Sequence, residues 1–264
     1  MGETIGIISL KGGVGKTSTV VALGDALANF DRKVLLVDGN LSSPNLGLHL
    51  NMVEPEKTLH DVLNRKSNPR EAVHNFDNFD FIPASVFSNS DVSPLKLRSK
   101  ISYLKRGYDV ILVDSSPALN EETLAVMLAS DKLLVVTTPD IPTLSTTLKA
   151  VKLAKQRGTV IAGLILNKVY NKNFELSLRD IEDTAEVPVM AVIPYDMHFS
   201  KALSLSKPYT THRPKSAGSE EYKRLAASLI GERYKPVKLK KFFRWINPRK
   251  QDINREIFYR SLFG

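Results

Sequence analysis

Residues 9 to 18 carry the residue types that a phosphate group needs, at the spacing that a phosphate-binding loop uses. Gly12, Gly13 and Gly15 precede Lys16 and Thr17. Glycines let backbone N–H groups converge on a phosphate, and the N-terminus of a following helix adds partial positive charge. Lys16 is then placed to reach the β- and γ-phosphates, and the Thr17 hydroxyl to ligate Mg²⁺. The stretch predicts a nucleoside triphosphate site.

The segments on either side of this loop have the patterns of a strand and a helix. Residues 4–8 form a short apolar run, and residues 19–27 have the apolar periodicity of an amphipathic helix. A glycine-rich turn between a strand and a helix is the context in which this motif binds phosphate. The predicted nucleotide-binding residues of the loop are Gly12, Gly13, Val14, Gly15, Lys16, Thr17 and Ser18.

Two further apolar runs each end in an aspartate. Residues 32–38 end at Asp38, and residues 108–114 end at Asp114. In open α/β sheets, ligand-binding groups gather at the carboxyl ends of the strands. An apolar run that ends in Asp after a phosphate-binding loop is typical of a residue that holds Mg²⁺, here through water at Asp114. We therefore predict a Mg²⁺ site formed by Thr17, Asp38 and Asp114.

Strands and helices alternate along most of the chain. Such alternation favours an α/β fold of P-loop NTPase type, with a doubly wound, mostly parallel sheet and right-handed crossovers. We predict an ATPase domain over residues 1–230, a linker over 231–236 and a basic amphipathic helical tail over 237–264. After Asp114, the expected strands are 132–137, 160–166 and 187–193, and the expected helices are about 144–157, 174–186 and 219–230.

Composition excludes several classes of protein. The 264 residues contain no cysteine, which excludes disulfides, thiolate metal sites and cysteine catalysis. No run of about 18 apolar residues is present and the N-terminus lacks a signal-peptide pattern, so we expect a cytoplasmic protein. The net charge is +9, and the residues from Lys235 onward contribute nine basic and two acidic side chains. Most of the positive charge therefore lies in the tail.

The tail has the pattern of a basic amphipathic helix. Leu239, Phe242, Phe243 and Ile246 follow one another at i, i+3, i+4 and i+7, with Trp245 beside them. Aromatic burial combined with attraction to anionic headgroups is typical of membrane-surface binding. Packing against the protein's own body, binding to nucleic acid and docking to a protein partner remain open as alternatives. The residues after 250 could form a second amphipathic helix.

The phosphate-binding loop departs from the standard pattern in one respect. Leu10 occupies the position of the first glycine, and a second lysine, Lys11, follows it. With this K-G-G-x-G-K-[ST] motif the sequence resembles the deviant Walker A group of ATPases, the MinD/ParA family, over roughly residues 3–230. The resemblance implies ATP and Mg²⁺ as cofactors. It also implies an ATP-bound homodimer in which Lys11 reaches the partner's nucleotide, so that Lys11 and Lys16 act as catalytic residues.

Two further segments resemble the switch regions and the base-binding segment of that family. Residues 44–50 resemble switch I of archaeal MinD-like proteins, and residues 115–117 resemble switch II. Relatives commonly have D-x-D after the second strand, whereas this chain has Asp38-Gly39-Asn40. The resemblance gives Asn40 the place of the residue that orients the attacking water, and Asn167 and Pro194 the places of base-binding residues.

An asparagine at position 40 leaves two interpretations of the hydrolysis step. An amide oxygen is able to hold a water molecule, but it offers neither a negative charge nor a proton acceptor. Either hydrolysis is slow and the ATP-bound dimer long-lived, or another group completes the water site.

The family resemblance implies a switch that is controlled by ATP. The ATP-bound dimer would bind a surface, expected to be the cytoplasmic membrane, and hydrolysis stimulated by a protein partner would release it. The expected process is spatial positioning, such as division-site placement. The alternatives are a ParA-like partition ATPase that binds DNA, and a very slowly hydrolysing scaffold whose state depends on the nucleotide.

Overall fold

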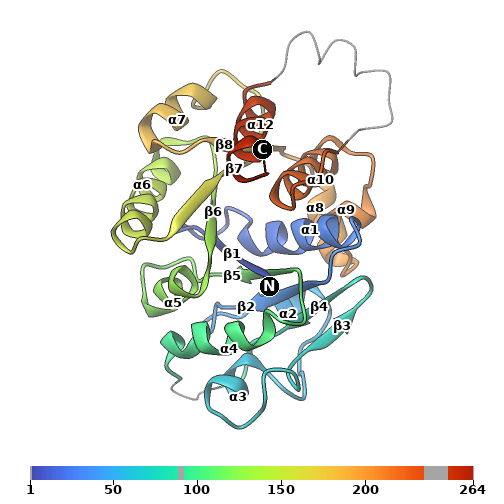
Figure 1. The fold of residues 1–264 in the computed structure, drawn as a ribbon. Helices are drawn as coiled ribbons and strands as arrows, with labels where there is room; N and C mark the ends of the chain where they lie inside the picture. The colour runs from blue at the N-terminus through green and yellow to red at the C-terminus, as the bar shows by residue number, and fades with distance from the viewer. Residues whose placement is uncertain (1, 89–91, 235–248, 264) are drawn as a thin grey trace.

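The computed structural model describes residues 2–88, 92–234 and 249–263. Their centre is an eight-stranded sheet in the order β3-β4-β2-β5-β1-β6-β7-β8 (Figure 1). All neighbouring strands are parallel except the antiparallel pair β3 and β4. The strands are β1 (Glu3–Ile8), β2 (Val34–Asp38), β3 (His74–Phe76), β4 (Phe79–Ile82), β5 (Val110–Asp114), β6 (Lys132–Thr137), β7 (Val160–Val169) and β8 (Val189–Pro194).

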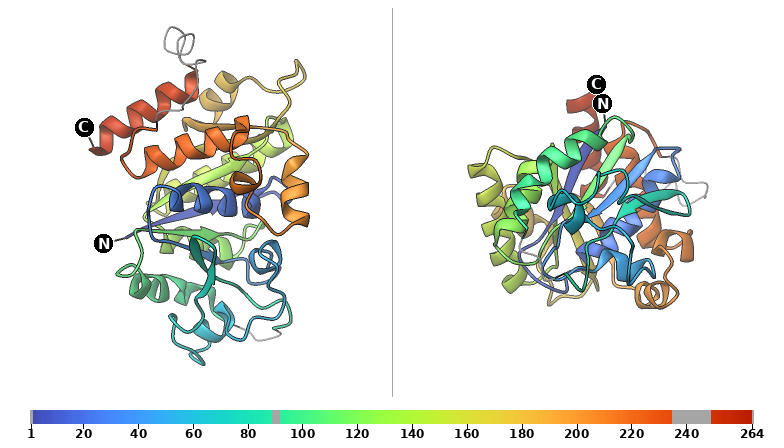
Figure 2. Two further views of the ribbon diagram at one scale, coloured as in Figure 1. Left: turned by 90° about the vertical axis from the view of Figure 1, so that its right-hand side faces the viewer. Right: turned by 90° about the horizontal axis from the view of Figure 1, so that it is seen from below.

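Helices cover both faces of this sheet (Figures 1 and 2). One core lies under α4, α5, α6 and α7, and the other lies under α1 and α10. The arrangement confirms the predicted doubly wound α/β fold. The helices are α1 (Lys16–Ala28), α2 (Leu46–His49), α3 (Leu59–Leu63), α4 (Leu97–Leu104), α5 (Glu121–Ala129), α6 (Ile141–Gln156), α7 (Leu178–Ala185), α8 (His198–Ser204), α9 (Tyr209–His212), α10 (Ala217–Leu229) and α12 (Lys250–Phe263), with a 3-10 turn at Pro94–Lys96.

The central strands are apolar along their whole length because both of their faces are covered. Ile7 contributes to the core under α1, whereas its neighbour Ile8 contributes to the core under α5. Every residue of β2 and of β5 is buried, including the aspartates that end them. Strands buried on both sides are read in the sequence as continuous apolar runs, and this is why these strands could be predicted.

The sheet order brings three loops together at one end of the molecule. β1 lies between β5 and β6, and β2 lies on the far side of β5. From β1 the chain passes to β2, which lies on the β5 side of β1. From β5 it passes to β6, which lies on the other side of β1, so the direction in which strands are added changes at β1. Such a switch point leaves a crevice outside the carboxyl ends of the strands. The loop at residues 9–15, Asp38 and Asp114 all lie there.

The tail prediction divides into two parts. The first predicted tail helix lies outside the described residues, together with the proposed membrane-binding residues Leu239, Phe242, Phe243, Trp245 and Ile246. A second helix after residue 250 is confirmed as α12. Its buried residues, however, are the polar Gln251, Asn254 and Arg255, whereas Ile253 and Ile257 are exposed. Phe258 is partly buried against the core under α1 and α10, so this helix faces the protein with both polar and apolar side chains.

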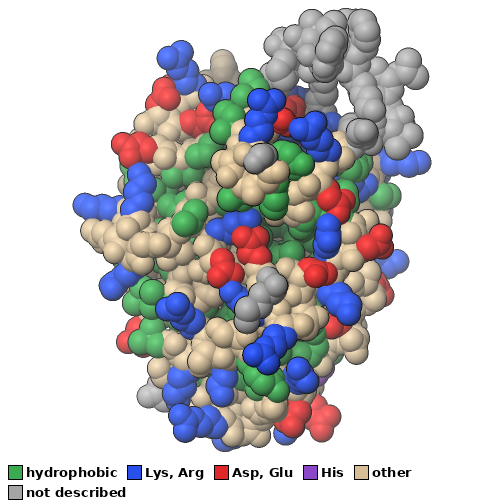
Figure 3. Space-filling view, viewed as in Figure 1, with side chains coloured by type: hydrophobic (Ala, Val, Ile, Leu, Met, Phe, Trp, Pro, Cys, Tyr) green, Lys and Arg blue, Asp and Glu red, His purple; other side chains and the backbone are tan. Residues whose placement is uncertain are grey.

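The surface seen in Figure 3 mixes basic, acidic and apolar side chains. No helix within the described ranges is both long enough and apolar enough to cross a bilayer. The mixed surface agrees with the sequence, in which residues before 235 carry little of the net positive charge.

Candidate nucleotide site

The glycine-rich loop is shaped as a cradle that is open on one side. Gly13 and Gly15 have positive φ angles of 75° and 94°, which side chains with a Cβ adopt only with strain. A Cβ added at Gly12 or Gly13 would meet no heavy atom within 4 Å, so the space in front of the loop is free. The helix α1 begins directly after the loop, at Lys16. Backbone N–H groups and a helix N-terminus facing open space fit a phosphate group.

Lys16 is held inside the protein rather than in solvent. It is only 8% exposed, and burial lowers the pKa of its ammonium group, while Asp114 acts in the opposite direction. A buried lysine beside an open cradle offers a positive charge that water screens weakly. This agrees with the predicted contact to nucleotide phosphates.

Asp114 and Thr17 form the second part of the site. The Thr17 hydroxyl donates to Asp114 Oδ2 at 2.5 Å, while Asp114 Oδ1 is buried and has no hydrogen-bond partner among the described residues. Burial raises the pKa of Asp114 to about 6. A hydroxyl and a buried carboxylate with an unused oxygen are the oxygen ligands that Mg²⁺ prefers, so the residues present fit this ion.

Asp38 lies directly beside Asp114, in register on the neighbouring strand. Its Oδ2 accepts the backbone N–H groups of Asn45 at 3.0 Å and Leu46 at 2.9 Å, and its Oδ1 accepts that of Asn40 at 3.2 Å. Burial, followed by repulsion from Asp114, raises the pKa of Asp38 to about 7. Asp38 thus anchors the loop after β2, and its predicted role beside Mg²⁺ stays a prediction.

Asn40 is buried beside this anchor and keeps one acceptor unused. It is 4% exposed, and its side-chain Nδ2 donates to the carbonyl oxygen of Ser43. Its Oδ1 is buried without a hydrogen-bond partner in the described part of the chain. A buried acceptor of this kind normally finds a water or a ligand. The geometry is compatible with the predicted role in holding a water molecule.

His49 is a site residue to which sequence reasoning gave no role. Its Nε2 lies 3.4 Å from the hydroxyl of Ser18 in α1, and its Nδ1 lies 2.9 Å from the carbonyl oxygen of Asn45. Burial lowers the pKa of His49, which favours the neutral ring. The contact ties α2 to the helix that follows the cradle. No spacing in the sequence indicates it, because the partners are separated by 31 positions.

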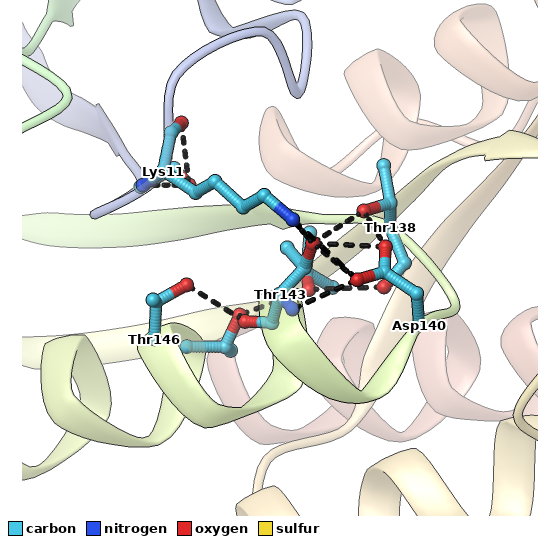
Figure 4. A network of polar contacts seen from close by, with 8 residues as sticks. Lys11, Thr138, Asp140, Thr143 and Thr146 are labelled. Carbon is cyan, nitrogen blue, oxygen red and sulfur yellow. Dashed lines mark hydrogen bonds and ion pairs between the residues drawn. The ribbon is translucent and has the colours of Figure 1, made fainter.

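Lys11 lies at the rim of the cradle and contacts its own chain (Figure 4). Its Nζ lies 3.0 Å from Thr143 Oγ1 and 3.6 Å from Asp140 Oδ1. Asp140 is the N-cap residue of α6, where its side chain also accepts the Thr143 N–H. Lys11 must leave these partners before it is able to reach another subunit. Asp140 and Thr143 were not predicted, although Asp followed by Ile-Pro-Thr is typical of a helix start.

Asn167 and Lys168 support the cradle from the end of β7. Asn167 Nδ2 donates to the Val14 carbonyl oxygen at 2.8 Å, and Lys168 Nζ donates to the Gly13 carbonyl oxygen at 2.6 Å. Asn167 is therefore next to the loop, and its hydrogen bond stabilises the loop's backbone. Pro194 ends the adjacent strand β8, in register with Val169. Base binding by Asn167 and Pro194 stays a prediction.

The two buried aspartates make the stability of the nucleotide-free protein depend on pH. Because both folded pKa values lie above the ordinary 3.8, the folded state retains protons that the unfolded chain has released. Stability is therefore lost as the pH rises through 6 and 7. In EDTA at pH 8 we expect Asp114→Asn to raise the melting temperature by about 2–6 °C over wild type. The difference should shrink as the pH falls toward 4.

Scanning calorimetry between pH 5 and pH 8 measures this difference. Asp77→Asn is the matched control, because the same change is made at an exposed position and should give no such pH-dependent gain. If wild type instead became more stable relative to Asp114→Asn as the pH rose to 8, this result would contradict raised pKa values for the two buried aspartates.

Comparison with known proteins places this site in context. A family model described as an AAA domain matches residues 2–160. An uncharacterized ATP-binding protein of Methanocaldococcus jannaschii is 33% identical, over 100% of this chain and 98% of its own length.

Two solved structures have the same fold. The cell division ATPase MinD of Pyrococcus furiosus has a TM-score of 0.80 and 36% identity, covering 86% of this chain and 97% of its own. The septum site-determining protein MinD of Pyrococcus horikoshii, solved with Mg-ADP, has a TM-score of 0.80 and 33% identity. This alignment covers 87% of this chain and 96% of that chain.

Proposed function

Since the chain belongs to the MinD/ParA family of P-loop ATPases, we propose that it is an ATP-dependent dimerising switch that binds a membrane surface in its ATP state. Hydrolysis, stimulated by a protein partner, releases it from that surface. The observation that carries the proposal is the open cradle before α1 with Lys16, Thr17 and Asp114 gathered at it. The protein resides in the cytoplasm and is reversibly peripheral to the membrane.

ATP and Mg²⁺ are the cofactors of this site. The backbone N–H groups of residues 12–15 and the ammonium group of Lys16 bind phosphate, and Thr17 and Asp114 hold Mg²⁺, with Asp38 beside them. When bound, the metal neutralises phosphate charge and so supplies electrostatic stabilisation. Lys16 adds a positive charge from a buried position, where it acts more strongly than in water. Asn40 Oδ1 orients the attacking water.

The carboxyl-end loops offer a surface for a second copy of the chain. Four large apolar residues in loops or helix starts after strands β5 to β8 are between 60% and 76% exposed: Leu119, Ile141, Phe174 and Met197. They follow the carboxyl ends of these strands, at the end of the sheet that also holds the cradle and Lys11. A symmetric dimer needs one self-complementary patch on each subunit, and the patch formed by these loops would include the bound nucleotide. Such a dimer would place each Lys11 at the other subunit's phosphates.

The tail supplies the membrane contact. Its apolar residues at i, i+3, i+4 and i+7, with lysines beside them, suit an anionic bilayer. Two tails in one dimer bind a surface much more strongly than one tail, because the second contact becomes intramolecular. Dimerisation by ATP is thereby converted into membrane attachment. Division-site placement is the process that fits, since relatives are named as septum site-determining proteins.

Co-sedimentation with phosphatidylglycerol vesicles tests this function. We expect the full-length protein to sediment with ATP and to stay in solution with ADP. The double variant Phe242→Ser, Phe243→Ser should lower the bound fraction in ATP at least about tenfold, because each phenylalanine would contribute apolar burial in the bilayer interface. Val160→Ser is the matched control, since Val160 is 63% exposed on the ATPase body.

The outcomes of this experiment separate the candidate functions. Binding to DNA but not to vesicles would replace the membrane by nucleic acid, as in a partition ATPase. Equal sedimentation with ATP and ADP would contradict a switch. Substitution inside the tail is preferable to truncation at Gly231, because α12 contacts β8 and α10 and its removal would uncover them.

A further inference from the structure

The loop after β2, in which Asn40 lies, is held by a carboxylate from α5. Glu122 Oε1 accepts the backbone N–H of Ser42 at 2.9 Å, and Glu122 Oε2 accepts the Ser42 hydroxyl at 3.2 Å. Ser42 is exposed, whereas Glu122 is only 9% exposed. Two hydrogen bonds from one residue to a carboxylate fix that residue in orientation as well as in position. Glu122 therefore holds the residue two positions after Asn40.

Glu122 belongs to the helix that follows the second site aspartate. The chain passes from Asp114 through residues 115–120 into α5, and Glu122 lies in the first turn of this helix. The Thr123 N–H donates to the Asn120 side chain at 3.1 Å, and the Thr123 hydroxyl donates to the carbonyl oxygen of Ala118 at 2.7 Å. The loop and the helix start are thus one hydrogen-bonded unit. Glu122 joins this unit to the loop after β2.

A second buried side chain holds Leu41, which directly follows Asn40. His60 Nδ1 accepts the backbone N–H of Ser85 at 3.1 Å, so the neutral ring carries its proton on Nε2. Burial lowers the pKa of His60, which favours this neutral form, and the ring is hydrogen-bonded to the backbone of Leu41. His60 from α3 and Glu122 from α5 therefore hold the two residues that follow Asn40.

These contacts limit where the Asn40 side chain lies. On its other side, the Asn40 backbone N–H donates to Asp38 Oδ1 at 3.2 Å, so the chain is held both before and after Asn40. A side chain that orients a reacting water has to be kept within about 0.5 Å of its productive position by the residues around it. Glu122 provides such support from a neighbouring loop.

We propose that Glu122 is a positioning residue for ATP hydrolysis. By holding Ser42 it keeps Asn40 Oδ1 at the position of the attacking water, and it makes that position depend on the loop that follows Asp114. The effect on turnover rests on the proposed function, whereas the support of the loop by Glu122 is measured independently of turnover.

Hydrogen exchange tests the support of the loop in the nucleotide-free protein. Glu122→Ala removes both acceptors, and water replaces them at the exposed Ser42, so the variant should keep the fold. We expect exchange in residues 39–46 to become at least about fivefold faster than in wild type. Glu121→Ala is the matched control, because it removes the neighbouring carboxylate of the same helix turn, which is exposed. Equal exchange in wild type and Glu122→Ala would overturn the support.

Single-turnover hydrolysis of radiolabelled ATP tests the positioning role. We expect Glu122→Ala to lower the rate about tenfold while the affinity for ATP changes less than about twofold, because Asn40 is no longer held in place. Glu122→Gln should keep at least about half of the wild-type rate, since its amide oxygen still accepts the Ser42 N–H. Glu121→Ala should hydrolyse at the wild-type rate. A Glu122→Gln protein as slow as Glu122→Ala would overturn positioning through this hydrogen bond.

A double-mutant cycle shows whether Glu122 acts through Asn40. In an Asn40→Ala background, Glu122→Ala should lower the rate by less than about twofold, because the side chain that it positions is already gone. The same tenfold loss in both backgrounds would overturn action through Asn40. If wild type binds ATP but hydrolyses none, the proposed function fails, and the exchange result alone decides whether Glu122 supports the loop.

Discussion

Replacement of Lys11 by alanine is expected to leave ATP binding nearly unchanged while abolishing ATP-dependent dimerisation. Turnover should fall at least about 100-fold, because a positive charge directed at the transferred phosphoryl group stabilises the charge that develops there. In the isolated subunit Lys11 is bound by Thr143 and Asp140 at the start of α6 and is 41% exposed. It is therefore outside the cradle in which its own subunit binds phosphate.

Lys16→Ala is the matched comparison, since both lysines belong to one loop. Lys16 is buried at the start of α1, so its loss should abolish nucleotide binding itself. Equilibrium binding of a fluorescent ATP analogue separates the two variants, and light scattering after size exclusion reports the dimer. A Lys11→Ala protein that still dimerises with ATP would contradict action across the interface.

Asp140→Asn provides a second comparison on the same contact. The substitution removes the negative charge 3.6 Å from Lys11 Nζ and keeps a side-chain oxygen that caps α6. If the contact within one subunit competes with the contact between subunits, this variant should dimerise at lower ATP concentrations than wild type. The ion pair is half exposed, so the expected change is small, about two- to fivefold.

The residues that local pattern determines could be predicted from the sequence. The strands β1, β2 and β5 are continuous apolar runs because both sheet faces are covered, and two of them end in the site aspartates. The cradle could be predicted because its glycines and Lys16 are adjacent in the chain. A short strand predicted at residues 79–83 is confirmed as β4, but β3 was missed, because it has three residues without apolar alternation.

The residues that support the site could not be predicted, because their partners are distant in sequence. Lys11 and Thr143 are 132 positions apart, and Thr19 and Tyr222 are 203 apart. The inward face of α12 is another case. Ile253 and Ile257 are exposed, whereas Asn254 and Arg255 bond to the edge strand β8 and to the carboxylates of Glu182 and Glu221. Phe258 of the same helix packs against the core under α1 and α10.

Replacement of Asn40 by aspartate is expected to raise the rate of ATP hydrolysis by about 10- to 100-fold, as measured by phosphate release. Asn40 Oδ1 is buried and has no hydrogen-bond partner among the described residues, so its capacity as an acceptor is unused. A carboxylate at this place would orient the attacking water and also accept its proton, whereas the amide only orients it. Asp has the shape of Asn but cannot donate to the Ser43 carbonyl oxygen, which keeps Asn45 Nδ2 as a donor at 2.8 Å.

The same substitution should destabilise the protein when Mg²⁺ and nucleotide are absent. Position 40 is 4% exposed and lies beside Asp38, whose pKa is already raised to about 7 by burial and by Asp114. A third carboxyl group there has to ionise against two neighbours, or remain protonated. The melting temperature in EDTA should therefore fall relative to wild type as the pH rises from 5 to 8, and Mg²⁺ with ATP should restore it.

Asn45→Asp separates the role of position 40 from the effect of added charge on this loop. Asn45 Nδ2 donates to the same Ser43 carbonyl oxygen as Asn40 Nδ2, at 2.8 Å, but Asn45 is exposed. The control variant should hydrolyse ATP at the wild-type rate. A rate that stays the same in Asn40→Asp, with ATP still bound, would show that another group positions the water and that Asn40 does not limit turnover.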